Sequence, residues 1–343
     1  MGMAPGTHVR LFDAYIEARE SAGEDIEAQE AMSTSDFATY LSKFIRHTFL
    51  QRFTEVQGQW TQYTRDFSVE DFDDYTSSRF GRFADVPRKA LNGPYDQLTI
   101  REFNGETITL FEYGAAISVT RQLIIADRLN KVAELPGLAA EALARTMSKE
   151  AAITQFQNNP TMYDGNALFS AAHANTGATT ALTANDTGMG LLQALELKLD
   201  SQTDDEGYKI ATPGAPYTLI LPIDYRWIAN ALINNELILN AAGTQLVANL
   251  VRGRYNVIEE RFFTDTNNYY MASDLKGPLG FLAHVTLNGN NTPFIGLKDP
   301  GVRAVLGGDD PYSFEFDEVD WKLRHDFSFK PVEWRGIAAA LVP

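Results

Sequence analysis

The chain has 343 residues, 44% of them hydrophobic, and its 29 basic and 45 acidic side chains give a formal net charge of −16. It contains no cysteine, which excludes disulfides, thiolate nucleophiles and cysteine-ligated metals. The acidic balance argues against a protein whose main role is to grip nucleic-acid phosphates, and no run of 18 apolar residues occurs that could span a membrane.

The N-terminal region divides into a polar arm and an amphipathic helix. Residues 1–35 carry seven acidic side chains against two arginines, which is typical of a mobile arm. From Ser35 or Asp36 to about Phe53, apolar residues recur at helical spacing and predict a helix. The chain begins without the charged start and apolar core of a secretory signal, so we expect synthesis in the cytoplasm.

Residues 60–113 predict a long two-stranded excursion with a charged far end. The segment from Trp60 to Val69 alternates weakly, as strands do, and two further alternating segments flank Asn104-Gly105, a dipeptide typical of hairpin turns. An isolated hairpin cannot bury a face, so this one should lie on its own domain or on another subunit.

The far end of this excursion is basic. An acidic cluster over residues 66–74 precedes four basic residues that we expect to contact an adjacent subunit, namely Arg79, Arg82, Arg88 and Lys89. The alternative is a solvated loop whose charges are incidental.

Helices and strands alternate through the rest of the chain. Strong helix formers predict a long helix over 137–157, which Asn158-Asn159-Pro160 should end, and residues 121–135 are also helical in pattern. Further patterns predict helices over 188–199 and 223–233, a buried strand over 217–222, a strand pair formed by 254–263 and 269–273, half-exposed strands over 312–323, and a final buried strand in WRGIAAAL.

The stretch DGNALFSAAHANTG, residues 164–177, brings Asp164, Ser170 and His173 close together in sequence. A hydrolase would need a G-x-S-x-G elbow, which is missing, and triad members normally converge from distant segments. His173 has no second histidine at metal spacing, and no Gly-rich phosphate loop occurs. We therefore expect no catalytic, cofactor-binding or metal-binding residue, and no cofactor.

We favour an architectural interpretation of this stretch. Asp164-Gly165 would make a turn, Leu168 and Phe169 would be buried, and the polar residues after them would satisfy backbone groups. A cytoplasmic hydrolase that uses Ser170 and His173 remains the alternative from another class of protein.

The span from Ala115 to Gly177 resembles the major capsid (major head) proteins of tailed phages, especially Mu-type head subunits. The residues that match the family pattern DG-x-x-LF-S-x-x-H-x-N-x-G are Asp164, Gly165, Leu168, Phe169, Ser170, His173, Asn175 and Gly177. The resemblance implies an α+β protein with the Hong Kong 97-type capsid fold. Its parts would be an N-terminal arm and helix (1–58), an extended β-hairpin loop (59–114), a peripheral domain (115–177 and 306–343) with a spine helix (137–157), and a mostly axial domain (178–305).

The resemblance also implies a function. The chain would be a structural protein, not an enzyme, that assembles with itself into hexamers and pentamers of an icosahedral head shell around packaged DNA. Portal, scaffolding and decoration proteins would be partners, DNA would be enclosed without sequence-specific binding, and no membrane would be involved. Assembly would take place in the cytoplasm of the bacterial host and lead to the virion. The short arm starting at Met1 suggests separate or absent scaffolding, and an encapsulin-like compartment is the alternative on the same fold.

Overall fold

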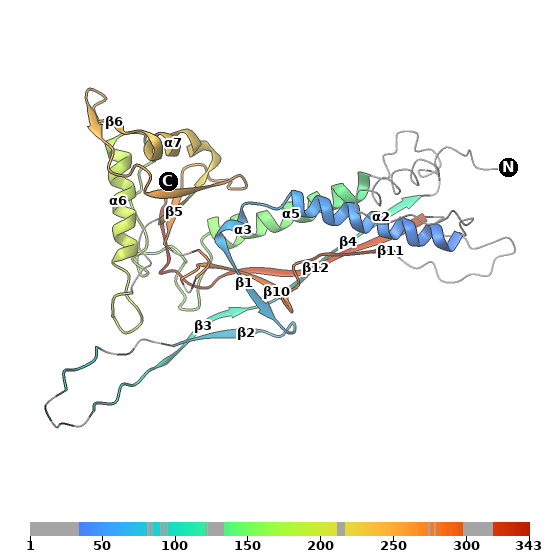
Figure 1. The fold of residues 1–343 in the computed structure, drawn as a ribbon, viewed down its shortest axis with the longest axis horizontal. Coiled ribbons are helices and arrows are strands. Elements are labelled where there is room, and N and C mark those ends of the chain that lie inside the picture. Colours follow the sequence, from blue (N-terminus) through green and yellow to red (C-terminus); the bar gives the residue numbers. More distant parts are fainter. Residues whose placement is uncertain are drawn as a thin grey trace. The chain divides into compact units, whose positions relative to one another are not determined.

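The computed structural model describes most of the chain, which clusters into two compact units (Figure 1). The described residues are 34–80, 83, 85–89, 91, 93, 95–120, 122, 134–210, 217–273, 275–277, 279–297 and 318–343. Unit 1 comprises Met1–Gln57, Glu112–Thr146 and Asn291–Asp326, and unit 2 comprises Gly58–Phe111, Met147–Asn290 and Phe327–Pro343. Residues 1–33 of the predicted arm, most of the helical segment 121–135 and the strand residues 312–317 lie outside the described residues.

Unit 1 is built on the helix α2 (Thr34–Glu55), which confirms the helix predicted from Ser35 or Asp36 to about Phe53. Ile45, Phe49 and Phe53 are buried and recur every fourth residue, so they form one stripe along the helix. The Phe49 and Phe53 rings stack with their centroids 6.2 Å apart. The apolar periodicity that predicted the helix is therefore also the face that α2 buries.

Strands complete unit 1 beside α2. They are β4 (Phe111–Thr120), β11 (Phe294–Leu297) and the first part of β12 (Glu318–Pro331). β11 runs antiparallel to residues 321–324 of β12, and β4 also pairs with β12. Ser118 on β4 donates a hydrogen bond of 2.6 Å to the carboxylate of Asp320 on β12.

The predicted spine helix is present and longer than expected. The helix α5 (Leu135–Lys149) continues directly into a π-helix, η2 (Glu150–Gln157). The π-helix ends at Gln157, as predicted, and the amide of Asn158 still donates to the carbonyl of Ile153, five residues earlier. Its last turn buries Phe156, whose ring lies within 6 Å of five aromatic rings of unit 2, those of Tyr63, Phe169, Phe263, Tyr270 and Phe281.

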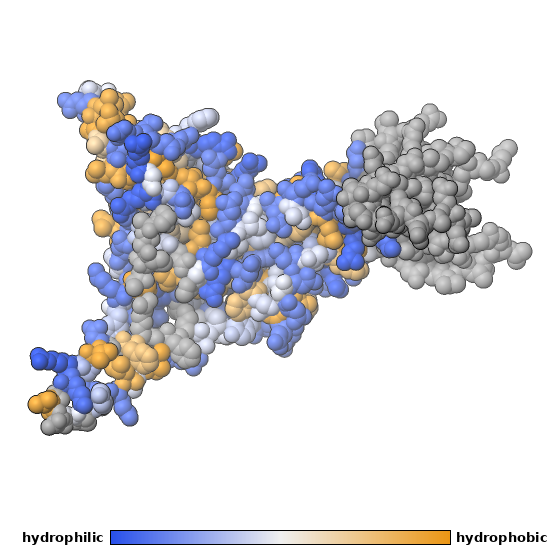
Figure 2. Space-filling model, in the orientation of Figure 1, coloured by the Kyte–Doolittle hydropathy of each residue, from blue (hydrophilic) through white to orange (hydrophobic). Residues whose placement is uncertain are grey.

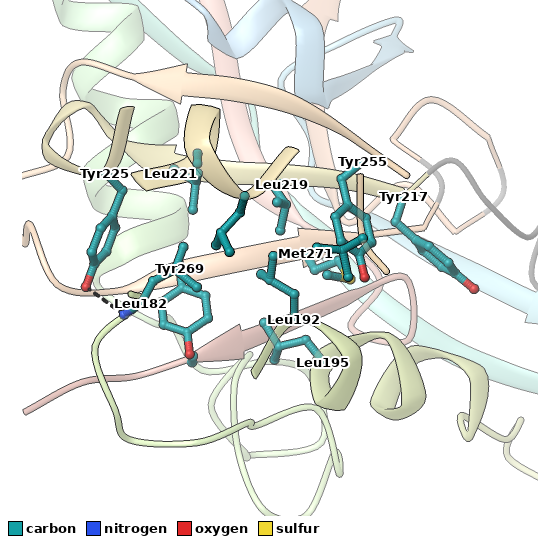
Figure 3. Close-up of a cluster of buried hydrophobic side chains, with 14 of the residues drawn as sticks. Leu182, Leu192, Leu195, Tyr217, Leu219, Leu221, Tyr225, Tyr255, Tyr269 and Met271 are labelled. Carbon is teal, nitrogen blue, oxygen red and sulfur yellow. Dashed lines mark hydrogen bonds between the residues drawn. The ribbon is translucent and has the colours of Figure 1, made fainter. Parts of the chain in front are cut away.

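A four-stranded sheet forms the main core of unit 2, in the order β13-β9-β5-β8. These strands are β5 (Tyr217–Pro222), β8 (Tyr255–Glu260), β9 (Tyr269–Ala272) and β13 (Ile337–Ala340). The helix α6 (Asp186–Asp200) contributes Leu192, Leu195 and Leu199 to the same core, and η3 (Ile223–Tyr225) with α7 (Arg226–Asn234) follows β5. Figure 3 shows leucines of α6 facing Leu219, Tyr269 and Met271 of the sheet.

The predicted hairpin of residues 254–263 and 269–273 is wrong in its pairing. Both strands exist as β8 and β9, but β5 lies between them, parallel to β8 and antiparallel to β9. All six residues of β5 are buried, so β5 is a central strand that takes a partner on each edge. The strands predicted at 217–222 and near the C-terminus, and the helices at 188–199 and 223–233, are confirmed.

Another group of strands in unit 2 follows a short helix. β1 (Thr64–Val69) runs parallel to β10 (Leu282–Leu287), and β10 pairs antiparallel with residues 327–331 of β12. The first four residues of the predicted strand, Trp60–Tyr63, instead form the helix α3. Trp60 and Tyr63 are both buried there. Burial of these two rings on one side of a helical turn outweighs the weak alternation that suggested a strand.

Two separate ribbons complete unit 2. β2 (Tyr75–Phe80) pairs with β3 (Glu102–Ile108), and β6 (Leu237–Leu239) pairs with β7 (Leu246–Ala248). The turn predicted at Asn104-Gly105 is wrong, because both residues lie inside β3. A Cβ at position 105 would lie 2.3 Å from Ser77 Oγ and 2.9 Å from the Ser77 carbonyl, so the glycine permits close approach of the two strands.

Candidate functional site

Two irregular segments of unit 2 carry the residues that the sequence singled out. The first, here called the motif loop, is residues 158–177, and the second, here called the β2–β3 loop, joins β2 to β3. Asn159, the second residue of the motif loop, has a φ of 52°, which is in the left-handed region. The Asn159 side chain accepts from the amide of Phe169 at 2.7 Å and donates to its carbonyl at 3.0 Å. One side chain thus closes the base of the loop.

The predicted turn at Asp164-Gly165 is present. Gly165 has a φ of 82°, and its amide donates to the carbonyl of Met162 at 2.9 Å. The carboxylate of Asp164 accepts from the amide of Asn166 at 3.0 Å, as in an Asx turn. After the turn, Leu168 and Phe169 are buried as predicted.

His173 ties the turn to the rest of the motif loop. Its Nδ1 lies 3.0 Å from the carbonyl oxygen of Leu168, and its Nε2 lies 2.9 Å from Oδ2 of Asp164. Both ring nitrogens therefore face oxygen atoms of the motif loop. The imidazole also stacks on Trp334, with centroids 4.2 Å apart and planes 9° apart.

The electrostatics of Asp164 follow from these contacts. Partial burial of the carboxyl opposes its ionisation, but hydrogen bonds from Asn166 and His173 outweigh that effect. The pKa of Asp164 is therefore lowered from its ordinary value.

The serine of the motif points to the backbone rather than to the imidazole. Ser170 Oγ accepts from the amide of His173 at 3.3 Å, while both ring nitrogens of His173 are engaged by Asp164 and Leu168. Asn175 is fully buried, accepts from the amide of Ser170 at 3.1 Å and donates to the Leu168 carbonyl at 2.8 Å. In this arrangement Ser170 and His173 do not form the side-chain hydrogen bond that a nucleophile and its base require.

The end of the motif loop joins the main sheet of unit 2. The amide of Gly177 donates to the carbonyl of Ala339 at 2.6 Å, and the amide of Ala339 donates to the carbonyl of Asn175 at 2.9 Å. These bonds make a parallel bridge between Thr176 and Ala339 on β13. Gly177 leaves room for Leu195, since an added Cβ would lie 2.5 Å from its Cδ2.

Sequence reasoning missed the residues that support His173 from the C-terminal end of the chain. Arg335 is 5% exposed, and its guanidinium lies 4.4 Å from the Trp334 ring centroid. That guanidinium bonds the carboxylates of Glu333 and Asp205 at 2.8 and 2.6 Å. Burial opposes the charge, yet the two carboxylates raise the pKa of Arg335. Only the apolar character of WRGIAAAL was visible in the sequence, and it predicted burial without these partners.

The β2–β3 loop, unlike the motif loop, exposes basic and apolar side chains. Arg88 and Lys89 are exposed, Arg79 lies in β2, and Arg82 lies outside the described residues. Apolar side chains that the sequence analysis did not single out are among the most exposed here, with Val86 at 81%, Leu91 at 97% and Tyr95 at 83%. Lys89 Nζ lies 3.9 Å from the centroid of the Tyr95 ring. The loop therefore presents basic and apolar groups together.

A metal site or a membrane-spanning helix would be a further functional feature of the part of the chain that the structure describes. No group of three or more His, Cys, Asp or Glu side chains in it could hold a metal ion. None of its helices combines the length and the apolar character needed to cross a membrane.

The sequence model of the family described as phage capsid protein matches residues 105–340. This match covers well over half of the chain, so the chain belongs to the phage capsid protein family. It is a major capsid protein, a structural component of the virion, as the sequence predicted. No curated protein sequence matches the chain.

Solved structures from three mycobacterial phages are similar in fold. The structure of Mycobacterium phage Adephagia is 12% identical, with 84% of this chain and 90% of that chain covered, at a TM-score of 0.53. The structure of Mycobacterium phage Cain is 13% identical, with 84% of this chain and 91% of that chain covered, at a TM-score of 0.52. The structure of Mycobacterium phage Patience is 11% identical, with 93% of this chain and 94% of that chain covered, also at a TM-score of 0.52. At such identities the likeness concerns the fold, and it confirms the predicted α+β, Hong Kong 97-type class. The Mu-type assignment and the predicted domain boundaries stay predictions.

Proposed function

We propose that copies of this chain assemble as hexamers and pentamers into a closed icosahedral head, which encloses packaged DNA without reading its sequence. The observation that carries this proposal is the match to the phage capsid protein family over residues 105–340. Such a shell needs many repeated contacts between copies. Each contact can be weak, because a closed symmetric shell repeats it at every interface. Portal, scaffolding and decoration proteins are the further partners that such a head requires, and assembly in the cytoplasm of a bacterial host belongs to the same proposal.

The β2–β3 loop is the first contact that we propose between copies. Arg79, Arg82, Arg88 and Lys89 would approach an acidic surface of the adjacent subunit, which a chain of net charge −16 offers widely. Val86, Leu91 and Tyr95 support this docking, because exposed apolar side chains beside charged ones are typical of interaction surfaces. The apolar residues would supply binding free energy, and the basic residues would set the register.

The motif loop has no enzymatic part in this proposal. Its eight family-motif residues would hold the end of the spine helix against the sheet, since their polar groups are directed to backbone groups and to Asp164. We expect His173→Ala to lower the folding yield and to leave no measurable chemistry altered. Turnover of generic esters that disappears in Ser170→Ala would instead support the hydrolase alternative.

Electron microscopy of the protein purified from expressing bacteria tests the assembly proposal. Closed shells, hexamers or tubes are the expected particles, whereas a protein that stays monomeric at every concentration would contradict it. The encapsulin-like compartment is less supported, because the family match is to phage capsid proteins. A small shell that co-purifies with one enzyme as cargo would favour the compartment. A large shell with nucleic acid protected from nuclease would favour the phage head.

A further inference from the structure

The β6–β7 ribbon of unit 2 carries apolar side chains on both faces. Ile238 is 3% exposed and packs with its cross-strand partner Val247 on the main core. Because side chains alternate along a strand, the residues on either side of them share the opposite face. The register pairs Leu237 with Ala248 and Leu239 with Leu246, so these four residues form that outer face.

This outer face is left open in the single chain. Leu237, Leu239 and Leu246 are 49%, 45% and 64% exposed, and Leu250, just beyond β7, is 67% exposed. In Figure 2 apolar surface gathers at the end of unit 2 that carries the ribbon labelled β6 in Figure 1. A two-stranded ribbon with one covered apolar face needs no second one for its own stability. A second apolar face on such a ribbon is typical of an interaction surface.

The ribbon is held in place before any partner arrives. Asn249 Nδ2 donates to the carbonyls of Leu232 and Asn235 at 2.5 and 2.8 Å, which ties the end of β7 to α7. At the turn, Asn240 Oδ1 accepts from the amides of Thr244 and Gln245 at 2.9 and 3.2 Å. A surface ordered in this way loses little conformational entropy when it binds.

Charge identifies the partner that this face suits. The chain has a net charge of −16, yet residues 237–251, LILNAAGTQLVANLV, contain no charged side chain. The charged residues that flank this segment, Glu236 and Arg252, pair with each other at 3.6 Å. Two copies of an acidic chain repel each other, so they approach most easily through a neutral surface. A neutral face has no charge that would attract a phosphate group or a basic protein.

We propose that the outer face of the β6–β7 ribbon, formed by Leu237, Leu239, Leu246 and Ala248, is a contact surface for a second copy of this chain. The inference rests on the proposed function, because a shell built from one subunit needs several self-complementary or mutually complementary surfaces. It adds to the β2–β3 loop a contact of a different kind, which is apolar and insensitive to salt.

The test compares variants of the full chain in sedimentation velocity over a range of concentrations. Leu239→Glu with Leu246→Glu places two charges on one cross-strand pair of the outer face. Leu239→Thr with Leu246→Thr keeps side chains that strands favour and removes only the apolar surface. The single variants Leu246→Glu on the ribbon and Leu197→Glu on α6 form a matched pair for added charge, since the two leucines are 64% and 67% exposed. Thermal unfolding of each free subunit establishes that the variants fold.

We expect the double Glu variant to need a concentration about tenfold higher or more for self-association, with the Thr variant intermediate and Leu197→Glu close to wild type. Unchanged association of the folded ribbon variants would overturn the inference while leaving the shell function intact. An equal loss in Leu197→Glu and Leu246→Glu would also overturn it, since the effect would then be one of general surface charge. If wild type forms only open oligomers that the ribbon variants lose, the ribbon contact stands and the closed shell fails. A monomeric wild type overturns both.

Discussion

The motif loop and the β2–β3 loop are both irregular, but they treat their side chains in opposite ways. In the motif loop, Leu168 and Asn175 are fully buried and the polar groups bond to backbone atoms of the same loop. In the β2–β3 loop, Leu91 and Tyr95 are 97% and 83% exposed. The first segment is complete within one chain, whereas the second presents surface that one chain leaves uncovered.

This difference shows how misleading residue type can be as a guide to function. Ser170, His173 and Asp164 have the chemistry of an active site, yet hydrogen bonding uses that chemistry to fix a turn. Val86 and Leu91 of the β2–β3 loop have no catalytic chemistry, yet their exposure makes that loop the stronger candidate for a functional surface. We therefore expect substitutions in the motif loop to act on folding and substitutions in the β2–β3 loop to act on assembly.

The largest effect on stability is expected from Phe169→Ala in the motif loop. Phe169 is 3% exposed, and its ring packs 5.9 Å from Phe156 and 5.4 Å from Tyr270. Loss of a buried phenylalanine lowers the free energy of unfolding by about 3–5 kcal/mol, which denaturant titration of the free subunit would measure. The matched control is Tyr95→Ala in the β2–β3 loop, which should change that free energy by no more than about 0.5 kcal/mol. Equal losses in both variants would break the comparison.

A smaller loss is expected from Asn175→Ala, which leaves the Ser170 amide without its side-chain acceptor and removes one of the two side-chain nitrogens that face the Leu168 carbonyl. An unsatisfied buried group costs about 1–3 kcal/mol, so the free energy of unfolding should fall by that order, with little change in the dependence on denaturant. Asn104→Ala in β3 is the control, because Asn104 is exposed. If Asn175→Ala is as stable as Asn104→Ala, the hydrogen bonds of the motif loop do not maintain its shape.

Local sequence signals predicted the elements that depend on local order. The stripe of Ile45, Phe49 and Phe53 and the helix formers of 137–157 specify helices through neighbours three and four residues apart. The Asp164-Gly165 turn depends on one side chain and one glycine, and it too was predicted correctly. In these places the information lies within a few residues of the structure it produces.

The errors have one cause, which is contact between segments far apart in sequence. The insertion of β5 between β8 and β9 depends on pairing of β5 along both of its edges, which no turn signal reveals. The sequence predicts a turn at Gly105, but this glycine instead allows Ser77 of the paired strand to approach closely. His173 stacks on Trp334, which lies near the C-terminal end of the chain. Periodicity carries no information on any of these partners.

A pH-dependent difference is expected from Asp164→Asn. The folded-state pKa of Asp164 is lowered, so the unfolded chain binds the proton more readily and stability falls as pH falls. The stabilising contribution is complete above the ordinary aspartate pKa of about 3.9 and is lost as pH falls through the lower folded value. Wild type should therefore exceed Asp164→Asn in free energy of unfolding at pH 6, with the gap narrowing below about pH 4. Asp85→Asn, at an exposed position of the β2–β3 loop, is the control for the loss of one carboxylate from the chain.

The smallest effect on subunit stability is expected from charge reversal in the β2–β3 loop, by Arg88→Glu with Lys89→Glu. Both side chains are exposed, and exposed ion pairs contribute only about 0–1 kcal/mol each, so the free subunit should unfold as wild type does. Under the proposed docking, the same change would remove two attractive contacts at every interface of a shell and add repulsion to a chain already at −16. Assembly, followed by light scattering, should therefore slow or stop although the subunit is intact.

Salt and a matched control separate docking from general repulsion. The electrostatic screening length shortens from about 10 Å at 0.1 M salt to about 3 Å at 1 M. High salt should therefore slow wild-type assembly if basic groups attract the neighbouring subunit. The double reversal Arg145→Glu with Lys149→Glu makes the same charge change on exposed positions of α5. If it blocks assembly as strongly, the net charge of the subunit is responsible and the β2–β3 loop has no special part. If only the loop variant fails to assemble, the β2–β3 loop, which is exposed in the single chain, contacts the adjacent subunit in the shell.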